Sequence, residues 1–91
     1  MVKRKLSIRL KIDGGEWMFF GEHARVGLFF WRNRKRWLTM FTAMLALRSD
    51  EVKARLSDIE TKVGREILDR KAQASSRRKL YRLKSDVEVE E

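Results

Sequence analysis

The chain has 91 residues, of which 22 are Lys or Arg and 13 are Asp or Glu, so its formal net charge is +9. A length under about 100 residues predicts one domain with a small core. The sequence has no Cys, which excludes a disulfide framework and a thiolate zinc site. The excess of cations favours a polyanionic partner, and the high charged fraction with no Pro and single Asn and Gln residues is typical of a thermophile.

The apolar segments are short. The longest, over residues 37–47, is interrupted by Thr39 and Thr42, whereas a membrane span needs about 20 apolar residues. The N-terminal residues lack the apolar run of a signal peptide. We therefore expect a soluble, cytoplasmic protein that makes no contact with a membrane.

Residues 5–12 alternate strictly between basic or polar and apolar side chains, which predicts a half-buried strand. The two glycines that follow suit a hairpin turn, and residues 17–20 form the predicted return strand. A two-residue or a four-residue loop gives the same facing of the side chains, and we expect Ile12 opposite Trp17 and Leu10 opposite Phe19. In both cases Trp17 and Phe19 face the core, while Met18 and Phe20 face outward beside cations.

Residues 25–31 are predicted to form a third strand, because Val26, Leu28 and Phe30 alternate with Arg25, Phe29 and Trp31. A cationic turn over residues 32–36 follows. From Trp37 the apolar period changes to three or four, which indicates a buried helix up to about residue 48.

Ser49 and Asp50 are typical of a helix start. Apolar residues then recur at spacings of three and four as far as Ile67, which predicts an amphipathic helix of roughly 24 residues that Gly64 weakens. Such a helix is longer than a small sheet. Part of its apolar face is therefore expected to pack in a homo-oligomer, a tetramer rather than a dimer, through Ile59, Val63 and Ile67. Residues 77–84 fit a helix or a fourth strand equally well.

These elements predict an α+β fold, in which an N-terminal antiparallel sheet of three to four strands packs against a buried helix and a long amphipathic helix. Residues 1–84 are expected to form one nucleic-acid-binding domain, with the sheet over about 4–31 and the helices over about 35–75. Residues 1–48 carry a net charge of +8, residues 49–84 carry +5, and residues 85–91 carry −4. The last segment is interpreted as a flexible acidic tail.

Catalysis finds little support in the sequence. His23 is the only imidazole and no nucleophile motif accompanies it, so we expect no enzyme and no catalytic residues. No metal-ligand spacing and no phosphate-binding glycine loop is present, so no metal, cofactor or small-molecule substrate is expected.

Aromatic and basic residues are interleaved in the first half of the chain, as in proteins that stack unpaired bases on aromatic rings and neutralise phosphates with cations. The sequence therefore predicts largely sequence-independent binding of single-stranded DNA, with RNA as a possible ligand. The expected binding residues are Arg9, Lys11, Met18, Phe20, Arg25, Phe29, Trp31, Arg32, Arg34, Lys35 and Arg36.

The order of a basic hairpin, an aromatic third strand, the cationic turn within Phe29–Trp37 and two helices resembles the archaeal ThermoDBP-related single-stranded DNA-binding proteins. The resemblance is to the short members without an extended C-terminal domain, and it covers most of residues 5–75. It implies an aromatic DNA cleft edged by cations, a homo-oligomer and a hyperthermophilic archaeal source.

Three alternatives stay open. One is a ribbon-helix-helix repressor of double-stranded DNA with residues 2–12 as its ribbon, although the glycines and the return strand interrupt that pattern. Another is an RNA-binding protein. The third is an assembly protein whose charge serves only solubility.

Overall fold

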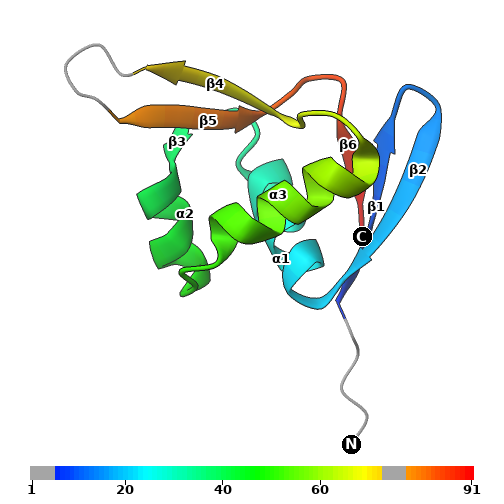
Figure 1. The fold of residues 1–91 in the computed structure, drawn as a ribbon, viewed down its shortest axis with the longest axis horizontal. Helices are drawn as coiled ribbons and strands as arrows, with labels where there is room; N and C mark the ends of the chain where they lie inside the picture. The colour runs from blue at the N-terminus through cyan, green and yellow to red at the C-terminus, as the bar shows by residue number, and fades with distance from the viewer. Residues whose placement is uncertain (1–5, 73–77) are drawn as a thin grey trace, which may run out of the picture.

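A computed structural model describes residues 6–72 and 78–91, which form an α+β fold, as predicted. Two three-stranded antiparallel sheets, with strand orders β2-β1-β6 and β3-β5-β4, flank the helices on two sides (Figure 1). The single predicted N-terminal sheet is thus two sheets. The elements in chain order are β1 (Ser7–Ile12), β2 (Gly15–Phe20), α1 (Gly21–Arg32), β3 (Leu38–Thr39), α2 (Met40–Leu47), α3 (Val52–Val63), β4 (Leu68–Ala72), β5 (Lys79–Leu83) and β6 (Glu88–Glu90).

The predicted hairpin is present as β1 and β2, and its inner face carries the buried Ile8, Leu10 and Phe19. Its register differs from the prediction by two residues, because Ile12 pairs with Gly15 and Leu10 pairs with Trp17. The turn uses Asp13 and Gly14, whose φ angles are 50° and 80°. These positive angles fit a two-residue turn of the primed type. A shift of two residues preserves the alternation, so Met18 and Phe20 face outward as expected.

Residues 25–31 belong to helix α1, so the predicted third strand is wrong. The helix lies among β1, β2, β6, α2 and α3, and residues are buried on several of its sides. Burial of Val26, Leu28 and Phe30 in such a helix produces the apolar alternation that is typical of a strand. Gly27 marks the close approach of the helix to β1, since a Cβ there would lie 2.6 Å from Cδ1 of Ile8.

Helix α2 covers part of the helix predicted from Trp37. It begins after Thr39, whose hydroxyl accepts a hydrogen bond from the Thr42 N–H at 3.1 Å. Only Ala43 and Leu47 are buried, while Phe41, Leu45 and Ala46 are exposed, so the expectation of a buried helix is wrong for the exposed side of α2. None of the helices in residues 6–72 and 78–91 has the length and apolar character that a membrane crossing requires.

Helix α3 is half as long as predicted, because it ends at Gly64 in the left-handed conformation with φ 85°. Its apolar residues Val52, Leu56 and Ile59 are buried in the core of the same chain. Ile67 lies beyond the helix, just before β4, and is also fully buried there. The predicted long helix is therefore wrong, and its apolar seam serves the core of this domain.

Gly64→Ala is expected to lower the free energy of unfolding by about 1 kcal/mol, because a residue with a Cβ is strained at this positive φ. No atom lies within 4 Å of a Cβ built there, so backbone strain alone sets the loss. The melting temperature should fall by about 4–8 °C. Gly64→Asn should lose less, and equal stability of the Ala variant and the parent would contradict the assigned helix end.

Strands β4 and β5 form a hairpin that projects away from the helices and that we call the wing (Figure 1). The sequence of residues 77–84 fits either a helix or a strand. The described part of this segment forms a strand over Lys79–Leu83. Leu68, Arg70 and Tyr81 lie on one face of the wing, and Lys71 and Arg82 lie on the other, as the alternation of paired strands requires. Strand β3 pairs with β5 and ties the wing to α2.

The predicted flexible tail instead forms strand β6, which pairs with β1. Val87 and Val89 are buried, and the carboxylates of Glu90 and Glu91 contact Lys11 at 2.8 Å and Arg32 at 3.0 Å. Strand β1 is consequently paired on both sides. The segment belongs to the domain, because apolar residues alternate with its acids.

Arg65 connects the turn of the first hairpin to the loop before β6. Its guanidinium contacts Asp13 at 3.0 Å and Asp86 at 2.9 Å. The hydrogen bond from Arg65 lowers the pKa of Asp86 below its ordinary value of 3.8 and raises the pKa of Arg65. The contacts join two loops that lie far apart in the sequence.

Asp86→Asn should therefore change the pH dependence of stability. A carboxylate whose pKa is depressed by folding contributes stability above its unfolded pKa and loses it as the pH falls through the folded value. The parent should have the higher urea midpoint at neutral pH, and the two midpoints should converge in acid. Glu88→Gln is the matched control, since Glu88 has no ion pair within the described residues. A difference that persists below both pKa values would contradict this role.

Candidate nucleic-acid interface

Helices α2 and α3 are joined by the four residues 48–51, which is the connection length of a helix-turn-helix. The three buried residues of α3 hold one side of the second helix against the core. Its exposed side carries Lys53, Ala54, Ser57 and Thr61, which we call the recognition face, and the exposed Asp58 lies beside Ala54 and Thr61 on the same side of the helix.

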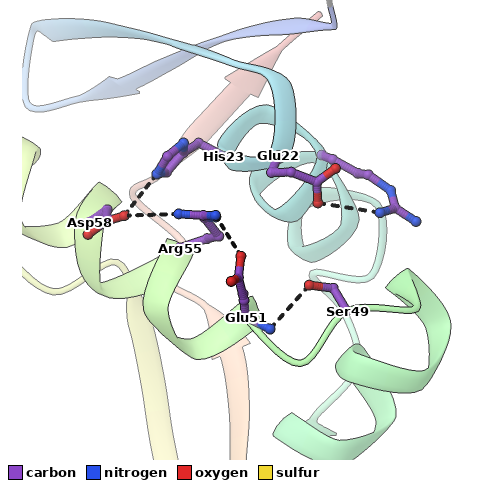
Figure 2. Close-up of polar contacts among 7 residues, drawn as sticks. Glu22, His23, Ser49, Glu51, Arg55 and Asp58 are labelled. Atoms are coloured by element: carbon purple, nitrogen blue, oxygen red, sulfur yellow. Dashed lines mark hydrogen bonds and ion pairs between the residues drawn. The ribbon is translucent and has the colours of Figure 1, made fainter.

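Glu51 of the turn before α3 and Asp58 of α3 are each held by neighbouring side chains, whereas Asp50 of that turn has no ion pair within the described residues. Figure 2 shows His23 of α1 directed at Asp58 of α3, with Arg55 extending between Asp58 and Glu51. The His23 Nε2 lies 3.0 Å from Asp58 Oδ2, and Arg55 contacts the same oxygen at 3.8 Å. Glu51, whose N–H donates to the Ser49 hydroxyl, also accepts from Arg55 across one helical turn. These contacts tie α3 to α1 and partly neutralise its carboxylates.

Glu60 is engaged on the other flank of the helix. One of its oxygens accepts from the Ile67 N–H at 2.9 Å, and the other contacts Arg70 of the wing at 3.4 Å. The carboxylate therefore fixes the base of the wing against the end of α3. Asp58 and Glu60 flank the stripe of Lys53, Ser57 and Thr61 on its two sides, and no carboxylate lies within the stripe itself.

The wing stands beside the recognition face, and residues of both line one groove. The groove has a volume of about 230 Å³, and Lys53 and Ser57 of α3 line it together with Lys79 and Tyr81 of β5. Arg70 also reaches into this groove and lies 5.7 Å from the centre of the Tyr81 ring. The arrangement places a helix face and a cationic hairpin side by side, facing the same solvent region.

The cations divide into paired and unpaired groups. Lys11, Arg25, Arg32, Arg55, Arg65, Arg70 and Lys84 form ion pairs with carboxylates. Others form none within the part of the chain that the structure describes, and most of these lie on α3, on the wing or in the turn before β3. They are Arg9, Arg34, Lys35, Arg36, Arg48, Lys53, Lys62, Lys71, Lys79 and Arg82.

The residues predicted to stack bases are not brought together. Met18 and Phe20 are exposed on the outer face of the first sheet, beside Arg9 and Lys11. Strand β6 adds Glu88 and Glu90 to that face, where Glu16 of β2 also lies. Two cations thus face three carboxylates. The hydrogen bond from Lys11 lowers the pKa of Glu90, which keeps this carboxylate charged.

The remaining predicted binding residues belong to α1 and the turn after it. Phe29 and Trp31 are half-buried on α1, where they pack against the core instead of joining Met18 and Phe20 on a strand face. Arg25 pairs with Glu22, and Arg32 pairs with Glu91. The guanidinium of Arg34 stacks on the Trp31 ring at 4.0 Å, while Lys35 and Arg36 are exposed in the turn.

The expected oligomer residues do not form a surface. Ile59 and Ile67 are fully buried within this chain, so neither is free to meet another subunit, and Val63 is half-buried against the same core. Among the described residues, no group of three or more His, Asp or Glu side chains is arranged to hold a metal ion.

The recognition face is not indicated by any pattern in the sequence. Ser57 and Thr61 form no recognisable sequence motif. The apolar spacing predicts one continuous helix through Gly64, so it does not predict the turn that precedes the wing. The helix start at Ser49 and Asp50 and the basic residues of 70–84 were the available signals.

Comparisons of the chain with protein-family models, with curated proteins and with solved structures each return no match. The resemblance to the ThermoDBP-related proteins therefore stays a prediction from the sequence.

Proposed function

We propose that this chain binds double-stranded DNA, with α3 in the major groove and the wing along the adjacent sugar-phosphate backbone. The observation that carries the proposal is the exposed stripe of Lys53, Ser57 and Thr61 on the second of two helices joined by a four-residue turn, with the unpaired Lys79 of the wing beside it. A helix-turn-helix presents its second helix to the major groove, whose width admits one α-helix.

The side chains of the recognition face suit the edges of base pairs. Lys53 can donate to guanine O6 and N7, and the hydroxyls of Ser57 and Thr61 can donate to or accept from several bases. Ala54 allows close approach and can contact a thymine methyl group. The unpaired Lys79 next to this face contributes charge for phosphates, which supplies affinity without base preference.

The experiment is a titration of a labelled duplex and of each of its separated strands, repeated over a range of salt concentrations. The duplex should bind more tightly than either strand, and its affinity should fall linearly with the logarithm of the salt concentration. Tighter binding of a single strand, or equal binding of both, would overturn the proposal. An RNA duplex serves as the control, because side chains cannot read its deep, narrow major groove.

Binding of single-stranded DNA is the second candidate, and the exposure of Met18 and Phe20 beside Arg9 favours it. The three carboxylates on the same face oppose it, since they repel phosphates. A ribbon-helix-helix repressor finds less support. Such a ribbon would pair with a second chain, whereas β1 is already paired along both edges with β2 and β6.

A further inference from the structure

The wing has a second cationic face, directed away from α3. Lys71 of β4 and Arg82 of β5 lie on this face, opposite to the one that carries Arg70 and Tyr81. Arg34 and Lys35, from the turn after α1, border it. We call Arg34, Lys35, Lys71 and Arg82 the outer wing surface. None of the four forms an ion pair within the residues that the structure describes.

Two tryptophans hold three of these four cations in place without neutralising them. The Trp37 ring lies 4.3 Å from the Lys71 ammonium and 4.4 Å from the Arg82 guanidinium, and Arg34 stacks on Trp31. An aromatic ring attracts a cation through its quadrupole and adds no counter-charge. The cations therefore still attract an anion from solution. Their side chains have also lost part of their conformational freedom before the anion binds.

The same surface is hollowed. A groove of about 550 Å³ lies between the end of α1 and the β5–β6 connection, with Trp31, Arg34, Lys35 and Arg82 among its lining residues. Lys84 and Glu88 also line it, but Lys84 is paired with Asp69 at 3.1 Å. A groove with three unpaired cations and one carboxylate has the charge that suits a run of phosphates.

We propose that the outer wing surface binds the phosphate backbone of a second DNA segment, so that one protein molecule bridges two duplexes. The inference extends the proposed function, which uses the inner face of the wing and α3. The two surfaces lie on opposite faces of one sheet, so a single straight duplex cannot cover both. Binding at the outer surface depends on charge and carries no base preference.

The test uses a duplex fixed to beads and a second, labelled duplex that is retained only when a protein bridges the two. The outer variant combines Lys35→Gln with Lys71→Gln. The control variant combines Arg9→Gln with Arg25→Gln, which remove the same charge from β1 and α1. The outer variant should retain about tenfold less labelled duplex than the parent or the control and show a salt dependence of capture that is shallower by about two.

Affinity for one duplex in solution is measured on the same proteins, and melting temperatures confirm that each variant is folded. The second surface is supported if the outer variant binds a single duplex as tightly as the parent does but no longer bridges two duplexes. Absence of bridging by the parent, undiminished bridging by the outer variant, or a matching loss of single-duplex affinity would each overturn it. The proposed function fails separately, if a Lys53→Gln variant of the recognition face binds single duplexes as the parent does.

Discussion

Replacement of Ser57 and Thr61 together by Glu is expected to lower the affinity for duplex DNA by about 100-fold or more. The two carboxylates would stand one helical turn apart on the recognition face, where the bases and phosphates of the major groove meet α3. Like charges brought together at an interface cost several kcal/mol. Two hydroxyl contacts to base edges would be lost as well. The loss should appear in direct titration of a labelled duplex at fixed salt.

A matched control adds the same two negative charges elsewhere. Met18→Glu with Ala46→Glu changes exposed positions on β2 and α2, away from the recognition face. This control should lose little more than the general effect of a lower net charge. Equal losses in both variants would assign the binding to net charge alone. A larger loss in the control would move the binding site to the outer face of the first sheet.

Removal of residues 86–91 is expected to lower the melting temperature by more than about 12 °C. The truncation exposes the sites of the buried Val87 and Val89, and burial of each valine contributes about 1.5–3 kcal/mol. It also leaves one edge of β1 without its partner strand and removes the carboxylates that contact Lys11 and Arg65. For a chain of this size, each kcal/mol corresponds to about 4–8 °C.

The control for this truncation keeps the two valines and removes only charge. Glu88→Gln, Glu90→Gln and Glu91→Gln together should change the melting temperature little, because ion pairs between exposed side chains contribute little. An unchanged melting temperature in the truncated protein would mean that the segment is a flexible tail, as its composition suggests. Thermal unfolding followed by circular dichroism distinguishes the two outcomes.

The first hairpin was predictable because two local signals agree. The strict alternation over residues 5–12 identifies a strand, and Asp13-Gly14-Gly15 supplies the positive φ angles of a tight turn. The register was not fixed by these signals. A two-residue turn and a four-residue turn both fit the sequence, and the resulting shift of two residues keeps every side chain on its own face.

Helix α1 was missed because the apolar pattern of a helix buried on several sides loses its period. Val26, Leu28 and Phe30 alternate as in a strand, yet Ala24, Gly27, Leu28 and Trp31 recur at helical spacing. The sequence therefore contains both a strand pattern and a helix pattern, and tertiary packing decides which structure forms. Ile67 likewise continues the helical spacing of the apolar residues of α3, although Gly64 ends the helix three residues earlier.

The last strand shows how composition can mislead. Four acids in seven residues indicate a solvated tail, but Val87 and Val89 alternate with Glu88 and Glu90 at the period of a strand. The excess of cations and its concentration with aromatics pointed to nucleic acid. The recognition face depends on how α2, α3 and the wing pack together, and no local pattern in the sequence indicates this packing.

The central claim is that α3 enters the major groove of a duplex, and site-directed cleavage of DNA tests it most directly. The chain contains no Cys, so Ser57→Cys and Phe20→Cys each introduce a single exposed thiol that can carry a DNA-cleaving iron chelate. Strand cleavage of the bound duplex is expected from position 57, with little cleavage from position 20. Cleavage from position 20 with none from position 57 would contradict it and would place DNA on the outer face of the first sheet.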